Sequence, residues 1–205
     1  MKKVDYKKEL KHLYGPSSKK FVIVEVPPMN YLMVDGKGDP NTSESYQQAI
    51  EALYGLSFTV KFDVKKKGLG PDYTVMPLEG LWWMEGRHDF DADDKDNWSW
   101  TSMIMQPDHV SAEHVASATY QLGEKKNPPA MDKIRFESYH EGPSVQILYI
   151  GPYDEEGPII TQMHKFIDEN GYQLHMKHHE IYLSDPRRSK PEKLKTVLRQ
   201  PVTKP

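Results

Sequence analysis

The chain has 205 residues, of which 27 are basic and 30 are acidic, for a formal net charge of −3. A charge so close to zero does not attract nucleic acid, so we expect no direct binding to DNA. The sequence has no cysteine, which excludes disulfides and thiolate metal sites, and it has no run of the ~20 apolar residues that a membrane span needs. No apolar stretch follows the N-terminal lysines, as a secretory signal requires, so we expect a cytoplasmic protein.

The first half of the sequence predicts two strands, a helix and two more strands. Residues 1–19 are polar and basic, which is typical of an N-terminal arm or a short helix. The first strand ends at Pro27 and Pro28, because proline cannot donate to a sheet ladder. Thr42 or Ser43 supplies the N-cap of the helix. The expected elements are strand 21–26, strand 31–36, a helix from 42 to about 62, strand 73–84 and strand 98–105.

The second half repeats this order after a connector. Ser111 predicts the N-cap of a connector helix that runs to about Gly123, and Asn127-Pro128-Pro129 predicts a linker. The elements that follow are expected as strand 134–139, strand 145–150, helix 155–170, strand 178–183 and strand 194–199.

The two halves also resemble each other in detail. In each, an apolar strand leads through a short glycine- and proline-containing turn into a helix, with an offset of about 115 positions. Each helix is then followed by a strand that carries a carboxylate among apolar residues, Glu79 in the first half and Glu180 in the second. The sequence therefore predicts an α+β domain of two fused repeats related by a pseudo-twofold axis, with an antiparallel sheet, helices on one face and a central ligand cleft.

Two segments of the second half carry a family resemblance. Gly151-Pro152-Tyr153 enters the second helix, and His179-Glu180-Ile181-Tyr182-Leu183 lies on a late strand of a two-copy chain. From about Lys20 this pattern resembles the GyrI-like small-molecule-binding family. The resemblance implies SHS2-like β-α-β-β repeats and a late-strand carboxylate that faces the ligand. The implied layout is an arm over 1–19 and one domain over 20–205, with repeats 20–106 and 131–205 and a connector over 107–130.

The resemblance also suggests two kinds of function. Some stand-alone members of the family hydrolyse cyclopropanoid DNA-alkylating natural products, whereas regulator members carry a DNA-binding module. Only about twenty residues precede the first expected strand, so we expect no such module and favour the hydrolase branch. A non-catalytic binder or sensor of planar, often cationic drugs is the alternative, and a protein inhibitor of the gyrase-inhibitor type is a weaker third.

Strand alternation gives the candidate site. His178, Glu180 and Tyr182 share one face of their strand, and if the helices cover the Ile181 face, the Glu180 face is the cleft. Burial among aromatic rings raises the pKa of a carboxyl group, so Glu180 is the candidate general base, with Tyr182 or Tyr153 as the hydrogen-bond donor. Glu79 is expected as a second, matching carboxylate. The expected ligand-binding residues are Trp83, Trp98, Trp100, Glu79, Tyr149 and His178.

Other interpretations of these residues remain open. Each Trp is nearly as well explained as core, and Glu180 alone is equally explained as a structural ion pair. His175, His178 and His179 line up only on a helix, whereas Ile181-Tyr182-Leu183 favours a strand, so we expect no metal site. We also expect no cofactor. The expected partner is a planar aromatic small molecule, and the sequence leaves the oligomeric state open.

Overall fold

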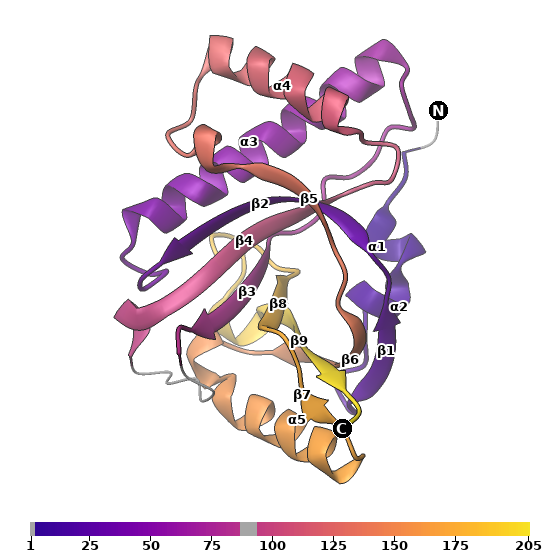
Figure 1. Cartoon of the computed structure of the whole chain (residues 1–205), viewed down its shortest axis with the longest axis vertical. Helices are drawn as coiled ribbons and strands as arrows, with labels where there is room; N and C mark the ends of the chain where they lie inside the picture. The colour runs from indigo at the N-terminus through magenta and orange to yellow at the C-terminus, as the bar shows by residue number, and fades with distance from the viewer. Residues whose placement is uncertain (1–2, 87–93) are drawn as a thin grey trace.

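The computed structural model describes residues 3–86 and 94–205, and in them one long antiparallel sheet curls into a half-barrel (Figure 1). Its strands run in the order β1-β6-β9-β8-β3-β4-β2-β5, and the short β7 pairs with β9. The fold is α+β, as the sequence predicts. The strands are β1 Val22–Val26, β2 Met29–Lys37, β3 Glu79–Met84, β4 Trp98–Gln106, β5 Arg135–Tyr139, β6 Gly142–Ile150, β7 Gln173–Leu174, β8 His178–Tyr182 and β9 Lys195–Thr203.

Local capping signals explain where the helices begin and end. The Ser43 side chain accepts a hydrogen bond from the backbone N–H of Tyr46 at the start of α3, and Gly68 ends this helix with φ +66°. Ser111 and His114 form a capping box at the start of α4. The helices are α1 Tyr6–Glu9, α2 Lys11–Tyr14, α3 Glu44–Lys67, α4 Ala112–Lys125 and α5 Gly157–Glu169, with 3-10 turns η1 Lys95–Asn97, η2 Met131–Lys133, η3 Tyr153–Glu155 and η4 Pro191–Lys193.

One expected strand is shorter in the structure. The sequence predicts a strand over 73–84, but the strand begins only at Glu79. Pro77 has no backbone N–H to donate, and before it only Tyr73 makes an isolated bridge, to Val4.

The two halves of the chain meet at the centre of the sheet and exchange their outer strands. β3 of the first half pairs with β8 of the second, which places the expected pseudo-twofold axis between them. β1 pairs with β6, although β6 belongs to the second half, and β5 pairs with β2 of the first half. The halves are therefore interlaced rather than placed side by side.

The helices α3 and α5 cover the same face of the sheet, at opposite ends of the molecule (Figure 1). Under α5, Met163 and Ile167 pack on Ile147 and Leu198, all of them buried. Under α3 lies the larger core, which includes Leu53, Leu56 and Val60 of the helix and Leu32 and Ile104 of the sheet.

The other face of the central strands is covered by the N-terminal segment. Leu13 and Tyr14 of α2 are both buried there. In the described part of this segment, residues 3–19, the structure shows two short helices, α1 and α2, and α2 packs on the sheet. Both faces of the central pair β3 and β8 are covered, but the side chains of His178, Glu180 and Tyr182 on one face of β8 stay half-buried rather than fully buried.

Candidate active site

Glu180 lies in the middle of β8, at the junction of the two halves. It stands opposite Gly80 of β3 and Leu198 of β9. Its Oε2 accepts a hydrogen bond of 2.8 Å from the Tyr182 hydroxyl, which in turn accepts one of 2.9 Å from Trp82 Nε1. This three-residue chain fixes the carboxyl group and shows that Glu180 and Tyr182 share a face.

The glycine opposite Glu180 makes room for this chain. A β-carbon at Gly80 would lie 2.8 Å from Trp82 Nε1 and 3.1 Å from the Tyr182 hydroxyl oxygen, closer than side chains tolerate. Position 80 therefore has no side chain because the Trp82 and Tyr182 side chains occupy that space.

Aromatic rings surround the carboxyl group from several elements. Tyr46, in the first turn of α3, lies with its ring centroid 6.0 Å from that of Trp82. The Trp98 ring meets Trp82 edge-on at 5.6 Å, and Tyr153 meets Tyr182 edge-on, also at 5.6 Å. Edge-to-face pairs at these separations are favourable and hold the rings in place. The Glu180 side chain is only 16% exposed as a result.

A second carboxyl group, Glu156, belongs to the same place and was not predicted from the sequence. It stands at the N-terminus of α5 and is 3% exposed. Its Oε1 has no hydrogen-bond partner among the described residues, and neither has the nearby hydroxyl of Thr196. In the sequence it is one of three acidic residues before a helix, where helix capping is the ordinary explanation, so only its burial distinguishes it.

The two carboxyl groups differ in their affinity for a proton. Burial raises the pKa of Glu180 to about 7, although the hydrogen bond from Tyr182 and the charge of His179 oppose the shift. Burial and the neighbouring Glu180 together raise the pKa of Glu156 to about 9, although the nearby Thr196 hydroxyl opposes the shift. Near neutral pH the pair therefore keeps at least one proton, and Glu156, whose pKa is raised further, is the carboxyl group that holds it.

His178 is a neutral neighbour in this environment. Its Nε2 lies 3.7 Å from Glu180 Oε1, which is too long for a hydrogen bond. Burial, followed by the charges of His164 and His179, lowers its pKa to about 3. His178 therefore lines the site without supplying a counter-charge to Glu180.

Two predicted ligand-binding residues point to the opposite face. Glu79 pairs with Ile181 in the β3–β8 register, so its side chain leaves the sheet on the side away from Glu180. Trp83 shares the face of Glu79: Lys177 Nζ lies 3.2 Å from its ring centroid, and its Nε1 donates to Glu85. The prediction that Glu79 matches Glu180 is wrong. A twofold axis between β3 and β8 relates residues on the same face of the sheet, and Glu79 lies on the Ile181 face whereas Glu180 lies on the Gly80 face. Trp82 occupies the place expected for Trp83.

The helices α3 and α5 cover the Glu180 face of the sheet, whereas the sequence leads us to expect them on the Ile181 face. Tyr46 of α3 and Glu156 of α5 are neighbours of Glu180, so these helices cover the Glu180 face. The site is thus located between the N-terminal ends of two helices and the sheet. The Ile181 face is covered by the N-terminal segment instead.

Glu79 belongs to a buried ionic network on that opposite face. His179 Nε2 lies 3.0 Å from Glu79 Oε2, and its Nδ1 lies 2.9 Å from Glu141 Oε1. Arg199 binds Glu141 Oε2 at 2.9 Å, and Tyr14 donates to Glu79 at 2.8 Å. Burial alone would lower the pKa of His179, but Glu141 and Glu79 raise it to about 9. Two acids and two bases balance here, which is a structural arrangement.

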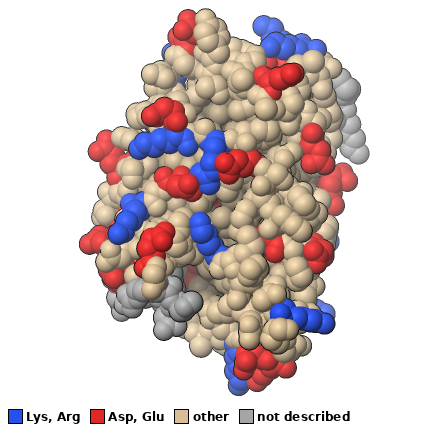
Figure 2. Space-filling view, in the orientation of Figure 1, with Lys and Arg blue, Asp and Glu red and all other residues tan. Residues whose placement is uncertain are grey.

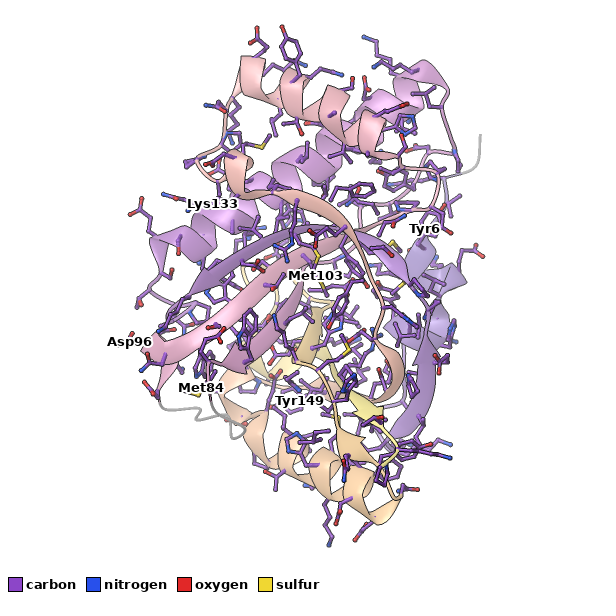
Figure 3. The ribbon with its side chains drawn as sticks, viewed as in Figure 1. Tyr6, Met84, Asp96, Met103, Lys133 and Tyr149 are labelled. Carbon is purple, nitrogen blue, oxygen red and sulfur yellow. The ribbon has the colours of Figure 1, made fainter. Side chains whose placement is uncertain are left out.

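The remaining predicted residues divide between site and core. Trp98 is half-buried beside Trp82, whereas Trp100 is 1% exposed and packs edge-on to Tyr46 at 5.0 Å. Tyr149, labelled in Figure 3 just above α5, donates its hydroxyl to the carbonyl of Pro152 at 3.1 Å. A cavity of about 410 Å³ lies elsewhere, beside the β5–β6 turn and β7, and none of these residues lines it.

A family model of the GyrI-like small-molecule-binding domain matches residues 19–203, so the chain belongs to this family. Two structures from Listeria innocua, an uncharacterized conserved protein and a hydrolase encoded by lin2189, each share 42% of their sequence with it. The alignments cover 98% of this chain and 100% of each relative, with TM-scores of 0.91 and 0.89. The chain is therefore a small-molecule-binding protein, and one of these similar structures is a hydrolase.

More distant likeness concerns the fold alone. The C-terminal domain of EcmrR shares 15% identity at a TM-score of 0.54, over 91% of this chain and 98% of that domain. No curated protein matches the chain.

None of the described helices is long and apolar enough to cross a membrane. On the face in Figure 2, acidic and basic side chains are interspersed.

Proposed function

We propose that this protein opens the cyclopropane ring of planar cyclopropanoid electrophiles by adding water, and so destroys toxins that alkylate DNA. The observation that carries the proposal is Glu180, a carboxyl group with a pKa of about 7 that is held by Tyr182 inside a layer of aromatic rings. The hydrolase from Listeria innocua, 42% identical over its whole length, supports the same reaction class.

The reaction needs few groups, because release of ring strain and formation of an aromatic ring drive it. The water oxygen forms a bond to the cyclopropane methylene carbon, and the carbon–carbon bond of the ring breaks. The electrons of that bond move to the conjugated carbonyl oxygen, which becomes a phenolate. Glu180 accepts the proton that water loses, a contribution of roughly 10² to 10⁴ in rate for a well-placed base.

The surrounding side chains have separate tasks. Tyr182 donates a hydrogen bond to Glu180 and so positions the base. Tyr153, which is 39% exposed, is the donor that stabilises the growing phenolate. The half-buried Trp98 and the exposed Tyr153 supply the ring surfaces on which a polycyclic ligand stacks, each contact being worth about 0.5–1.5 kcal/mol beyond burial, while the buried Trp82 and Tyr46 support them.

Turnover by the purified protein tests the proposal. Incubation with a cyclopropane-fused dienone should give the water adduct by mass spectrometry, and Glu180→Gln should lower kcat by about 10²-fold or more because the amide cannot accept the proton. Glu192→Gln, at an exposed position, is the matched control and should retain full activity. Absence of product from the wild-type protein, or full turnover by Glu180→Gln, would refute the proposal.

A second function is favoured by the paired acids, namely non-catalytic binding of planar cations. Glu156 and Glu180 lie together, and the described residues place no Lys or Arg in an ion pair with either one. A cationic dye would gain from the ionised form of Glu180 and from the ring faces together. Quenching of tryptophan fluorescence by a cationic acridine, without quenching by its uncharged analogue and without conversion of the dienone, would select this function.

A further inference from the structure

Glu156 occupies an unusual position for a carboxyl group. At the N-terminus of α5 an acidic side chain ordinarily accepts hydrogen bonds from the first free N–H groups of the helix. The Glu156 side chain makes no such capping bond to the helix. It is instead 3% exposed on the sheet side, and its Oε1 has no hydrogen-bond partner in the described part of the chain.

The described neighbours of Glu156 supply no positive charge. A buried carboxylate without a cation is strongly unfavourable, so the group keeps its proton instead. Burial of the side chain and the neighbouring Glu180 both favour the neutral form of Glu156. The titratable groups that face it are Glu180 and Tyr182 from β8, Tyr149 from β6 and Tyr153 from the turn before α5.

We infer that Glu156 is the acid of the site, the group that delivers a proton to the oxygen of the opened ring while Glu180 takes one from water. The inference rests on the function proposed above. The exchange balances: water gives a hydroxyl to carbon and a proton to Glu180, and Glu156 gives its proton to the phenolate oxygen. Release of the Glu180 proton to solvent and uptake of one proton by Glu156 from solvent then restore the starting state, so the cycle has no net proton change.

The tyrosines of the site are poorly suited to this step. Burial, followed by the charges of Glu156 and Glu180, raises the pKa of Tyr153 to about 12. Tyr153 therefore donates a hydrogen bond but does not release its proton near neutral pH. The Tyr182 proton is already directed at Glu180. Among the described groups of the site, Glu156 is the one left with a transferable proton.

The pH dependence of turnover tests the assignment. In the wild-type protein kcat should rise as Glu180 ionises and fall again as Glu156 loses its proton, which gives a bell-shaped profile. Glu156→Gln should lower kcat by about 10-fold to 10³-fold with KM nearly unchanged, and the fall at high pH should disappear. Glu155→Gln, at the exposed neighbouring position, should leave rate and profile unchanged.

A measurement without turnover gives an independent check. Infrared spectra at about pH 8, above the pKa of Glu180, should show the carbonyl band of a buried protonated carboxyl group that is strongly reduced in Glu156→Gln and retained in Glu155→Gln. An unchanged band in Glu156→Gln, or full activity of this variant, would overturn the acid assignment while leaving the proposed hydrolysis intact. Absence of turnover by the wild-type protein would instead remove the hydrolysis and the acid role that rests on it.

Discussion

At the scale of single residues, the site holds two largely buried carboxyl groups, Glu156 and Glu180, and the described residues place no Lys or Arg in an ion pair with either one. A buried carboxyl group that lacks a cation costs free energy, because in the unfolded chain water solvates its ionised form. Glu156 is 3% exposed, and one of its oxygens finds no hydrogen-bond partner among the residues described. Such a cost is ordinarily tolerated where a function requires the group.

Because burial of the Glu156 carboxyl group costs free energy, we expect its replacement by glutamine to stabilise the protein. Because the pKa of Glu156 is raised from its usual 4.5 to about 9, the folded state holds a proton that the unfolded state releases above pH 4.5. Wild-type stability should therefore fall as pH rises from about 4.5 to 9, by up to about 1.4 kcal/mol per pH unit from this group. Glu156→Gln removes that slope and should be more stable at about pH 7, by on the order of 3 kcal/mol.

Urea unfolding at pH 5, 7 and 8 measures the effect. The difference between Glu156→Gln and wild type should be small at pH 5 and grow with pH, while Glu155→Gln follows the wild-type curve. A difference that does not depend on pH would mean that Glu156 is already ionised in the folded protein.

At the scale of elements, register determines which side chains form the site. The sequence predicted the strand around Glu180 and the face that it shares with Tyr182, because alternation within one strand is a local property. It did not predict that Glu180 stands opposite Gly80, so Glu79 and Trp83 were assigned to the wrong face. A shift of one residue between two strands reverses every side chain, and only the pairing itself fixes it.

Burial was the other feature that local patterns did not reveal. Glu156 has the sequence context of an ordinary acidic residue before a helix, and its burial depends on the packing of α5 onto the sheet. By contrast, the order of elements, the helix caps at Ser43 and Ser111 and the repeat were all visible, because each depends on residues close together in the sequence.

The N-terminal segment is a further element whose attachment can be measured. Tyr14 donates to Glu79 in the buried network, so Tyr14→Phe leaves a buried carboxylate oxygen without its donor. We expect a loss of about 1–3 kcal/mol in the free energy of unfolding. Tyr120→Phe is the control, since Tyr120 is 71% exposed. Equal unfolding midpoints for the two variants would show that α2 contributes nothing through this bond.

The contribution of the buried network of Glu79, Glu141, His179 and Arg199 to the free energy of unfolding depends on pH. The raised pKa of His179, about 9, means that its stabilisation is complete below pH 6.5 and is lost as pH rises through 9. Burial would raise the pKa of Glu141, but His179 and Arg199 hold it at about 2, so its stabilisation is complete above pH 4.5 and is lost as pH falls through 2. Both contributions are complete between about pH 4.5 and 6.5.

At the scale of the whole molecule, the two repeats depend on each other for their outer strands. β1 completes the sheet of the second half, and β5 completes that of the first. The central pair β3 and β8, which carries the candidate site, joins the halves. Neither half therefore contains a complete sheet or a complete site.

This interlacing predicts how the chain behaves when it is cut. Fragments 1–126 and 127–205, divided in the exposed linker, should associate when produced together, because each supplies an edge strand and a central strand to the other. Co-purification of an untagged fragment with a tagged one would show it. A β1 deletion in the first fragment should weaken the association, and independent folding of both fragments as monomers would contradict the prediction.

The strand exchange also affects how the protein is made. β1 leaves the ribosome early, yet its partner β6 begins at Gly142, more than a hundred residues later. At a synthesis rate of about 5–20 residues per second, β1 waits several seconds or longer with its ladder groups unpaired. During that interval the growing chain exposes a strand edge, and Pro27 and Pro28 just after β1 are residues that discourage pairing with a wrong partner.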